Sequence, residues 1–338
     1  MYAASRRRGD DSWGRAGDAE DMTASTSPVI ETHGLTKRYG DRTVVDGLDV
    51  EVPPGVVAGF VGPNGAGKTT TLRMLLGLVR PTAGDGRVLG VPLSAPAGYL
   101  PRVGAMIETP AFYPGLSGER NLAVQATLGG YDPTEIPALL ARVGLDGRGR
   151  DPYQSYSLGM KQRLGIAAAL LGGPRLLVLD EPANGLDPTG IRQMRELLRS
   201  LTSGGATVFV SSHLLAEVEQ VCDWLVMIDH GRRVFQGPTA QLLAAGADEL
   251  MLGCEHAADL PRLATLLEKR GLRATRTGDR LQVGLTDLLD QASDRGLAGL
   301  LAEINRAAMA EEVALVELSV TRSNLEDRYA TLMTEGAR

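Results

Sequence analysis

The sequence lacks several features that mark other classes of protein. Its two cysteines, Cys222 and Cys254, are too few for a disulfide framework and do not have the spacing of a metal site. No apolar stretch approaches the ~18 residues that a membrane-spanning helix needs. The basic segment near the N-terminus is followed by acidic residues and not by the apolar core of a signal peptide. These absences predict a soluble protein and fit a reducing compartment such as the cytoplasm.

The chain also has no excess of positive charge. Its formal net charge is -6, and only four of its 35 basic residues are lysines. This charge gives no electrostatic reason to expect a nucleic-acid partner. With 43% hydrophobic residues the chain can bury a core, which excludes global disorder. Its 338 residues are enough for one large domain with a smaller one, or for two of middle size.

Three segments of the chain differ in composition. Residues 1–28 mix arginines with acidic residues and offer almost nothing to bury, so we expect a disordered tail there. An alternative interpretation is that translation begins at Met22. Residues 29–244 have the pattern of an α/β domain, with a mostly helical part at about 115–172. Residues 245–338 have the pattern of a small α+β domain.

Apolar runs predict the main elements of these segments. Buried strands are expected at residues 56–63, 175–182 and 206–213. An apolar face predicts a helix over 69–79, and residues 224–237 predict two strands joined by a hairpin turn. In the last segment we expect an amphipathic helix, a hairpin, a strand and a final helix opened by a capping box of Ser323 and Glu326.

A glycine-rich loop lies between the first of these strands and the helix that follows. The segment "GPNGAGKTT" fits the pattern G-x-x-x-x-G-K-[ST] of a P-loop, in the strand-to-helix context that the pattern requires. Backbone N–H groups of such a loop cradle phosphates, the lysine reaches the β and γ phosphates, and the threonine hydroxyl holds Mg²⁺. The residues expected around the nucleotide are Gly62, Asn64, Gly65, Ala66, Gly67, Lys68, Thr69 and Thr70.

Two acids end the strand "LLVLDEP". Because side chains alternate along a strand, Asp180 and Glu181 should point in different directions. Asp180 is expected to face Mg²⁺, and Glu181 to face the γ-phosphate as the general base. His213 closes another predicted strand, where it could touch a γ-phosphate, although a lone histidine at a strand end is more often packed or capping.

The five segments "GPNGAGKTT", "SYSLGMKQRLGIA", "LLVLDEP", "GLDP" and "VFVSSH" occur in the order of the ATP-binding cassette of ABC transporters. Over about residues 29–240 the chain resembles this family. The resemblance implies an α/β fold of the P-loop NTPase class, with a mixed sheet core and a helical subdomain, here followed by the small C-terminal domain. It also implies ATP and Mg²⁺ as cofactors and ATP hydrolysis as the activity.

The helix start in "SYSLGMKQR" resembles the family's signature, which caps the γ-phosphate held by the P-loop of a second cassette. Ser157 and Gly159 match the signature, whereas Leu158 stands in place of a glycine and Met160 in place of a glutamine. The resemblance therefore implies a homodimer or a paired cassette, with each nucleotide site shared between two chains. The hydroxyl, backbone N–H groups and helix dipole would be the ligands.

Three further positions follow from the same resemblance. Tyr39 in "LTKRYG" matches the aromatic residue that stacks on adenine, with an ordinary strand tyrosine as the alternative. Asp187 in "GLDP" matches the loop that communicates across the dimer. Glu108 stands where the family has a glutamine that touches Mg²⁺ and senses the transporter. A carboxylate can also coordinate or orient water at Mg²⁺, so we expect Glu108 to keep this role.

Because the chain has no predicted span, the resemblance implies a permease on a separate polypeptide. The chain would then be cytoplasmic and attached to the inner face of the cell membrane through that permease. The region after Glu108, with Phe112 and Tyr113, is the expected docking surface, unless these aromatics belong to the core. Glu108 and "YSLGMKQR" resemble the bacitracin and lantibiotic type of exporter, and "NLEDRYATLM" resembles the tail of drug-exporter ATPases, which implies export of a drug, an antibiotic peptide or a lipid-like compound.

Two other functions remain open at this level. One is a soluble ABC ATPase that acts as a clamp or translation factor on nucleic acid. The short spacing between Lys68 and Asp180, the single cassette and the acidic charge disfavour it. The other is a regulatory ABC ATPase that is not coupled to transport, which the retained Glu181 disfavours.

Overall fold

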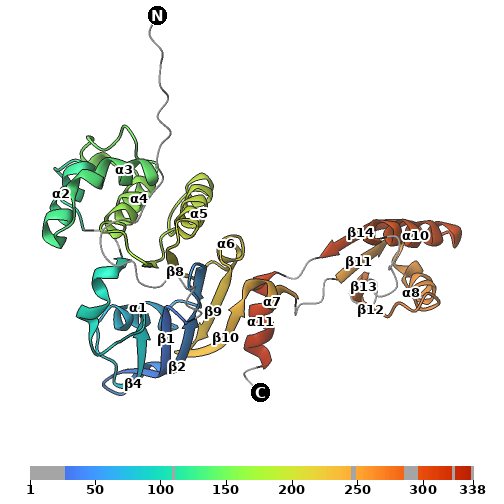
Figure 1. Cartoon of the computed structure of the whole chain (residues 1–338). Helices are drawn as coiled ribbons and strands as arrows, with labels where there is room; N and C mark the ends of the chain where they lie inside the picture. Colours follow the sequence, from blue (N-terminus) through green and yellow to red (C-terminus); the bar gives the residue numbers. More distant parts are fainter. Residues whose placement is uncertain (1–26, 109–110, 245–248, 285–295, 322–323, 336–338) are drawn as a thin grey trace, which may run out of the picture.

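The computed structural model describes residues 27–108, 111–244, 249–284, 296–321 and 324–335. These residues form three β-sheets and the helices around them (Figure 1). The tail expected to be disordered, residues 1–28, lies almost wholly outside the described part of the chain. Within that part, every helix is too short or too polar to cross a bilayer.

The central sheet has six strands in the order β10-β9-β3-β8-β7-β6. Its strands are Val57–Val61 (β3), Val103–Met106 (β6), Leu176–Asp180 (β7), Thr207–Ser212 (β8), Trp224–Asp229 (β9) and Arg232–Pro238 (β10). All neighbours are parallel except the β9–β10 hairpin. The three strands predicted from apolar runs are β3, β7 and β8, and they lie side by side with their carboxyl ends at one edge.

Both faces of the sheet are buried at β3, β7 and β8, which explains why these strands are mostly apolar. The edge strand β10 is more polar and partly exposed. On β7, Leu177 and Leu179 belong to the core on one face, and Leu176 and Val178 to the core on the other. The second of these cores also contains the side chains of a four-stranded antiparallel sheet with the order β2-β1-β4-β5. Its strands are Ile30–Tyr39 (β1), Arg42–Val52 (β2), Ala83–Val88 (β4) and Val91–Pro92 (β5).

Helix α1 (Lys68–Leu75) follows β3 and ends sooner than the sequence pattern predicts. The apolar face continues to Val79, but Gly77 adopts a left-handed conformation with φ 67°. The amide of Leu78 then donates to the carbonyl of Arg73, which is the closing bond of a Schellman motif. The hairpin turn after β9 is as expected, because His230 and Gly231 both have positive φ values, of 46° and 80°.

Three helices form a separate subdomain, drawn in green at the upper left of Figure 1. They are Gly118–Gly129 (α2), Ile136–Arg142 (α3) and Leu158–Ala169 (α4), and each contacts the other two. They fall in the region predicted to be mostly helical. The helices that return to the central sheet are Pro188–Ser203 (α5), Leu215–Glu219 (α6) and Thr239–Ala244 (α7).

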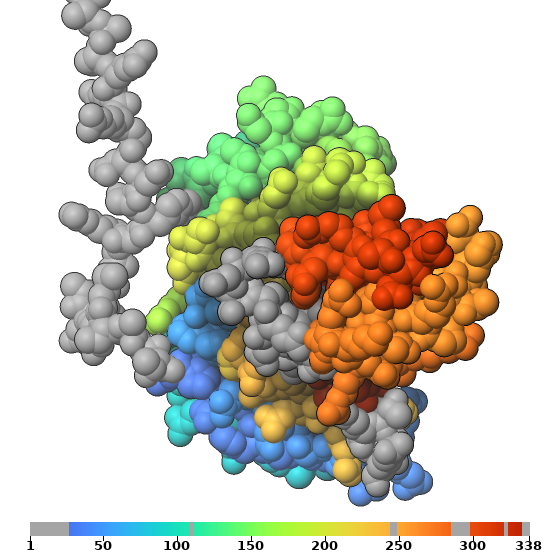
Figure 2. Space-filling model, turned by 90° about the vertical axis from the view of Figure 1, so that its right-hand side faces the viewer, coloured from blue at the N-terminus to red at the C-terminus, as the bar shows by residue number. Residues whose placement is uncertain are grey.

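Residues 249–284 and 296–321 form a small module with its own core. Its elements are Glu249–Cys254 (β11), Leu260–Glu268 (α8), Ala274–Thr277 (β12), Arg280–Gly284 (β13), Gly296–Ala310 (α10) and Leu315–Thr321 (β14). The sheet order is β12-β13-β11-β14, all antiparallel. This β-α-β-β-α-β arrangement is the split βαβ motif. Figure 2 shows the module, in orange and red, as a compact body on one face of the molecule.

The last helix, Leu325–Glu335 (α11), does not pack on this small sheet. It contacts α6 and α7, beside which it lies in Figure 1. Leu325 is fully buried there, in the core of the larger domain. The division of the chain at residue 245 placed this helix in the small domain. The structure differs because the helix has an apolar face that the core of the larger domain covers.

The start of α11 also differs from the sequence expectation. Ser323, the proposed cap, lies outside the described residues. The described cap is Asn324, whose side-chain oxygen accepts a hydrogen bond of 2.9 Å from the amide of Asp327. Asparagine is among the best N-cap residues, so Asn324 can start the helix by itself.

Replacing Leu325 with alanine should destabilise the larger domain and not the small module. Removing a fully buried leucine costs about 2–5 kcal/mol of unfolding free energy. Calorimetry of the full chain should show a lower transition temperature for the larger domain. The matched control is Leu267→Ala, which removes a fully buried side chain from the core of the small module. If both variants lower the same transition, α11 is not part of the larger domain's folding unit.

Candidate functional site

The loop from Gly62 to Gly67 needs glycine at both ends, for different physical reasons. A Cβ on Gly62 would come within 2.3 Å of the carbonyl oxygen of Ile228. Gly67 has φ 104°, and a Cβ there would lie 2.7 Å from the carbonyl oxygen of Val44. The neighbouring chain thus leaves no room for a side chain, and the loop's backbone can face outward to a ligand.

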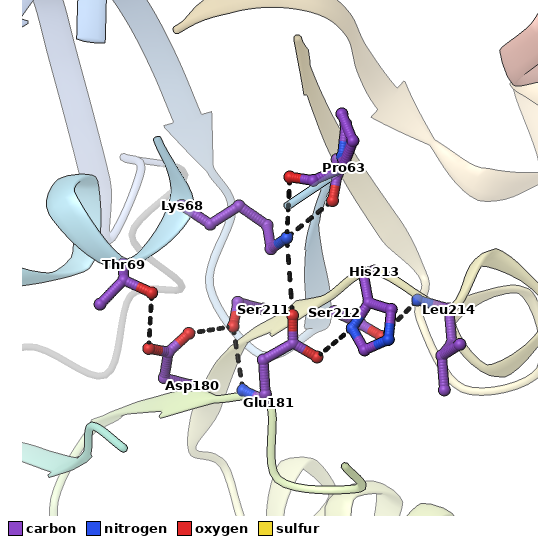
Figure 3. Close-up of polar contacts among 10 residues, drawn as sticks. Pro63, Lys68, Thr69, Asp180, Glu181, Ser211, Ser212, His213 and Leu214 are labelled. Carbon is purple, nitrogen blue, oxygen red and sulfur yellow. Dashed lines mark hydrogen bonds and ion pairs between the residues drawn. The ribbon is translucent and has the colours of Figure 1, made fainter. Parts of the chain in front are cut away.

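Lys68, the first residue of α1, points back into this loop. Its side chain is only 6% exposed. Its Nζ donates hydrogen bonds of 2.7 Å to the carbonyl of Gly62 and 3.3 Å to that of Pro63. The same Nζ lies 3.5 Å from a carboxylate oxygen of Glu181 (Figure 3). A positive charge is therefore held at the mouth of the loop, where a phosphate would sit.

Asp180 and Thr69 meet on the other side of the loop. The Thr69 hydroxyl donates a hydrogen bond of 2.9 Å to Asp180, which is buried at the end of β7. A hydroxyl and a carboxylate are oxygen ligands of the kind that Mg²⁺ prefers. The described residues contain no cluster of three or more His, Cys, Asp or Glu side chains that could hold a metal. Two protein oxygens suit a metal that takes its other ligands from phosphate and water.

Glu181 connects three parts of the site (Figure 3). One carboxylate oxygen lies near Lys68, and the other lies 2.8 Å from Nδ1 of His213, at the end of β8. An ionised carboxylate only accepts hydrogen bonds, so Nδ1 is the donor in this contact. Glu181 has a positive φ of 49°, which a glutamate rarely adopts. The chain turns sharply here, so Asp180 and Glu181 point to different partners. The reason is this turn and not strand alternation, because β7 ends at Asp180.

Ser211 holds this turn in place, and it was not singled out from the sequence. It lies opposite Asp180 in the parallel register of β7 and β8. Its fully buried hydroxyl donates a bond of 2.5 Å to Asp180 and accepts one of 3.0 Å from the amide of Glu181. The only signal in the sequence was its position two residues before His213, on the same side of a strand.

The structure places Glu108 away from the expected metal ligands. Its carboxylate is ion-paired with Arg73, which lies one helical turn after Thr69 on α1. Both side chains are exposed, and Glu108 has a positive φ of 61°. A contact of Glu108 with Mg²⁺ therefore remains a prediction, and it would require the pair with Arg73 to separate.

Tyr39 lies at the end of β1 with its ring 48% exposed. The Nζ of Lys37 lies 5.0 Å from the centre of this ring, within cation–π range. Tyr39 is exposed but has Lys37 over its ring, and a stacking contact with adenine remains a prediction. Tyr39 pairs across the strands with Arg42, at the start of the strand that contacts Gly67.

The signature residues line a second groove. Ser157 caps α4 by accepting a hydrogen bond from the amide of Met160, and Asp187 caps α5 by accepting one of 2.7 Å from Gly190. Both helix starts face one groove, whose lining also includes Leu158 and Gly159. This groove contains no residue of the glycine-rich loop. The loop and the groove are therefore two distinct regions of the chain.

Tyr156 anchors the start of α4. Its hydroxyl donates a hydrogen bond of 2.8 Å to the carbonyl of Arg148. Burial, with a smaller contribution from Asp151, raises the pKa of Tyr156 above its ordinary value, so the hydroxyl stays a neutral donor. The bond ties the helix start to the loop before it.

The two aromatics of the expected docking surface have different environments. Phe112 is partly buried and packs edge-on against Tyr153, with 5.2 Å between ring centres. Tyr113 is 60% exposed. Only Tyr113 is free for contact with a partner, and Phe112 belongs to the core.

Comparison with known proteins agrees with this site. A family model described as "ABC transporter" matches residues 45–184. The bacitracin transport ATP-binding protein BcrA of Enterococcus faecalis is 38% identical over 311 residues, which cover 91% of this chain and 97% of BcrA. The daunorubicin/doxorubicin resistance ATP-binding protein DrrA of Streptomyces peucetius is 35% identical over 318 residues, covering 92% and 94% of the two chains. A solved ATP-binding subunit of an ABC transporter superposes with a TM-score of 0.58 at 31% identity, covering 64% of this chain and 92% of that one.

Replacing Ser211 with alanine should lower stability more than the same change at Ser212. Ser211→Ala removes one of the two hydroxyl donors of the buried Asp180 carboxylate and the acceptor of the Glu181 amide, which costs about 1–3 kcal/mol. Ser212 is less buried, and its hydroxyl accepts a single bond from the amide of Leu214. In urea denaturation, both variants should have the same m-value, and the midpoint urea concentration should be lower for Ser211→Ala than for Ser212→Ala. Equal midpoints for the two variants would contradict a bridging role for Ser211.

Proposed function

The chain belongs to the ABC transporter family as an ATP-binding subunit, and we propose that it hydrolyses ATP to drive export of a drug, an antibiotic peptide or a lipid-like compound through a separate permease. The observation that carries the proposal is the contact of Glu181 with both Lys68 and His213. The named activities of relatives aligned over nearly their whole length support export of this kind. They also disfavour a regulatory ATPase without transport and a clamp on nucleic acid.

In the proposed reaction, ATP binds on the loop from Gly62 to Thr70, with its adenine on Tyr39. Backbone N–H groups and Lys68 bind the β and γ phosphates. Thr69 and Asp180 would hold Mg²⁺, which neutralises phosphate charge when bound. When ATP binds, phosphate oxygens replace the carbonyl of Gly62 and the carboxylate of Glu181 as partners of the Lys68 Nζ.

Glu181 acts as the general base of this reaction. Its carboxylate takes a proton from a water molecule as the water oxygen bonds to the γ-phosphorus and the bond to the β–γ bridging oxygen breaks. His213 orients that carboxylate by donating from Nδ1. Ser211 keeps the backbone of Glu181 in the turn that aims the side chain.

We further propose that two copies, or this chain and a related cassette, complete each site. The groove formed by Ser157, Leu158, Gly159 and Asp187 is a half-site that lacks a phosphate-binding loop of its own. The N-terminus of α4 would cap the γ-phosphate held by the partner, and the Ser157 hydroxyl still has its hydrogen to donate. Leu158 is 45% exposed and would enter that interface, together with Met160, in place of the smaller and polar residues of the family's signature. In the proposed cycle, ATP binding brings the two cassettes together and hydrolysis lets them separate. The permease changes conformation with them. Attachment to the inner face of the membrane comes through that permease.

Glu181→Gln should bind ATP and fail to turn it over. Loss of a general base lowers turnover by about 10²–10⁴-fold, while the loop and Lys68 are intact. We expect ATP with Mg²⁺ to convert the variant from monomer to dimer in light scattering. Lys68→Ala is the control, because it should lose ATP binding and dimerisation together. A Glu181→Gln chain that hydrolyses ATP at the wild-type rate would rule out the assignment of the base.

The same variant should identify the membrane partner. Tagged Glu181→Gln, expressed in the native host, is isolated from detergent-solubilised membranes with ATP and Mg²⁺, and bound proteins are identified by mass spectrometry. A stoichiometric protein with several predicted membrane spans is the expected result, and it should be reduced in a Tyr113→Ala background if this exposed ring is part of the docking surface. Recovery of only a soluble ATP-bound dimer would overturn the transport assignment.

A further inference from the structure

The short helix α6 begins two residues after His213, and its position bears on the site. It spans only Leu215–Glu219. A helix of one to two turns is not stable by itself, so its place is set by what it contacts. Leu214, just before it, is tied back to Ser212 by a bond of 3.0 Å. Any shift of α6 is therefore transmitted over a very short length of chain to the imidazole of His213.

One side of α6 is bound to α5 through Glu217. A single carboxylate oxygen of Glu217 accepts two hydrogen bonds from Arg195, of 3.0 Å from Nε and 2.8 Å from Nη2. Both side chains are mostly buried, with exposures of 22% and 20%. A charge-assisted pair with two hydrogen bonds and little exposure is held more firmly than a surface ion pair. The guanidinium of Arg195 also reaches the side chain of Gln220, at the end of α6.

The space between α5 and α6 contains only a small apolar cavity. Its volume is about 30 Å³, and its lining comes from both helices and from β8. Glu181 and Ser211 line it together with Arg195 and Glu217. Arg195 binds Glu217, and Arg199 binds the backbone at the end of α6, so hydrogen bonds from two arginines of α5 help to set the distance between the two helices.

The opposite side of α6 is bound to the C-terminal helix through Glu219. Its carboxylate accepts a hydrogen bond of 2.9 Å from the amide of Leu325, the first residue of α11. That amide is one of the N–H groups that a helix start leaves without an internal partner, and the helix dipole favours a negative charge there. Residues two apart on an α-helix point about 200° from each other. Glu217 and Glu219 thus hold α6 from opposite sides.

We propose that Glu217 and Glu219 are positioning residues for ATP hydrolysis, which hold α6 between α5 and α11 so that His213 keeps the Glu181 carboxylate aimed at the attacking water. The inference rests on the roles proposed above for Glu181 and His213. It gives the C-terminal helix a role, because the amide at the start of α11 is the partner of Glu219. It also links Asp187, the cap of α5, to His213 through Arg195.

The test is steady-state ATP hydrolysis by the full chain carrying Glu217→Met or Glu219→Met. Methionine keeps the length of the side chain and removes its acceptor oxygens. We expect kcat, measured per bound nucleotide, to fall roughly 10-fold, within the ~100-fold that a misplacement of 1 Å can cost. KM for ATP should change less than about 2-fold, because the glycine-rich loop and Lys68 are untouched.

Conservative and remote variants separate positioning from general damage. Glu219→Gln keeps an oxygen that can accept from Leu325 and should retain most of the wild-type kcat. Glu317→Met removes a comparable ion pair with Arg280, of 2.9 Å, in the small module and should leave kcat unchanged. Arg195→Met combined with Glu217→Met should be no slower than Glu217→Met alone, since both remove the same link.

The proposal is overturned if both methionine variants turn over ATP at the wild-type kcat. It is also overturned if Glu219→Gln is as slow as Glu219→Met, or if KM rises in step with the fall in kcat. Failure of the proposed function would look different. The wild-type chain would then hydrolyse no ATP, or Glu181→Gln would hydrolyse it normally.

Discussion

The contact that Glu181 makes with both Lys68 and His213 is the interaction on which the rest of the site depends. Glu181 directly follows β7, His213 directly follows β8, and Lys68 begins the helix that comes after β3. Parallel pairing of β3, β8 and β7 places the carboxyl ends of these strands at one edge of the sheet. In open α/β sheets this edge is where ligands bind. The sheet topology therefore creates the site, and the side chains only decide what it binds.

This arrangement has a local cost at Glu181. A glutamate in the left-handed region is strained by about 1–3 kcal/mol. The strain is offset by the hydrogen bond from its amide to Ser211 and by the two partners of its carboxylate. The same serine donates to Asp180, so one hydroxyl holds both the carboxylate of Asp180 and the backbone amide of Glu181. The surrounding hydrogen bonds hold Glu181 in this strained conformation, and such strain is typical of functional sites.

The molecule also keeps apart two regions that come together in the proposed cycle. The glycine-rich loop and the groove between α4 and α5 are distinct, because the lining of the groove includes no residue of the loop. Helix α6 connects three parts of the chain that take part in the proposed cycle. It follows His213 directly, it is bound to the helix that Asp187 caps, and it is bound to α11. A second copy and the C-terminal part of the chain can therefore both act on the same imidazole.

The family and the fold class were predictable from the sequence and are confirmed by the comparisons. Motifs such as "GPNGAGKTT" and "LLVLDEP" are local, because a phosphate-binding loop needs its glycines and lysine at fixed spacing within one strand–turn–helix unit. The three buried strands were visible for a similar reason, since burial on both faces demands continuous apolar runs. Of the expected site residues, Lys68, Thr69, Asp180 and Glu181 lie around the loop, whereas the signature residues and Asp187 line a separate groove. Their roles remain proposals.

The sequence by itself determined the nucleotide-binding unit, the order of its motifs and the residue types at its centre, because these depend on contacts within a few residues. Only the tertiary structure decided the partners that lie far apart in the chain. It brought Ser211 to Asp180, Arg73 to Glu108, and Leu325 to Glu219, across 31, 35 and 106 residues. No local pattern encodes such pairs, because strand register and helix packing set them only when the whole core has formed.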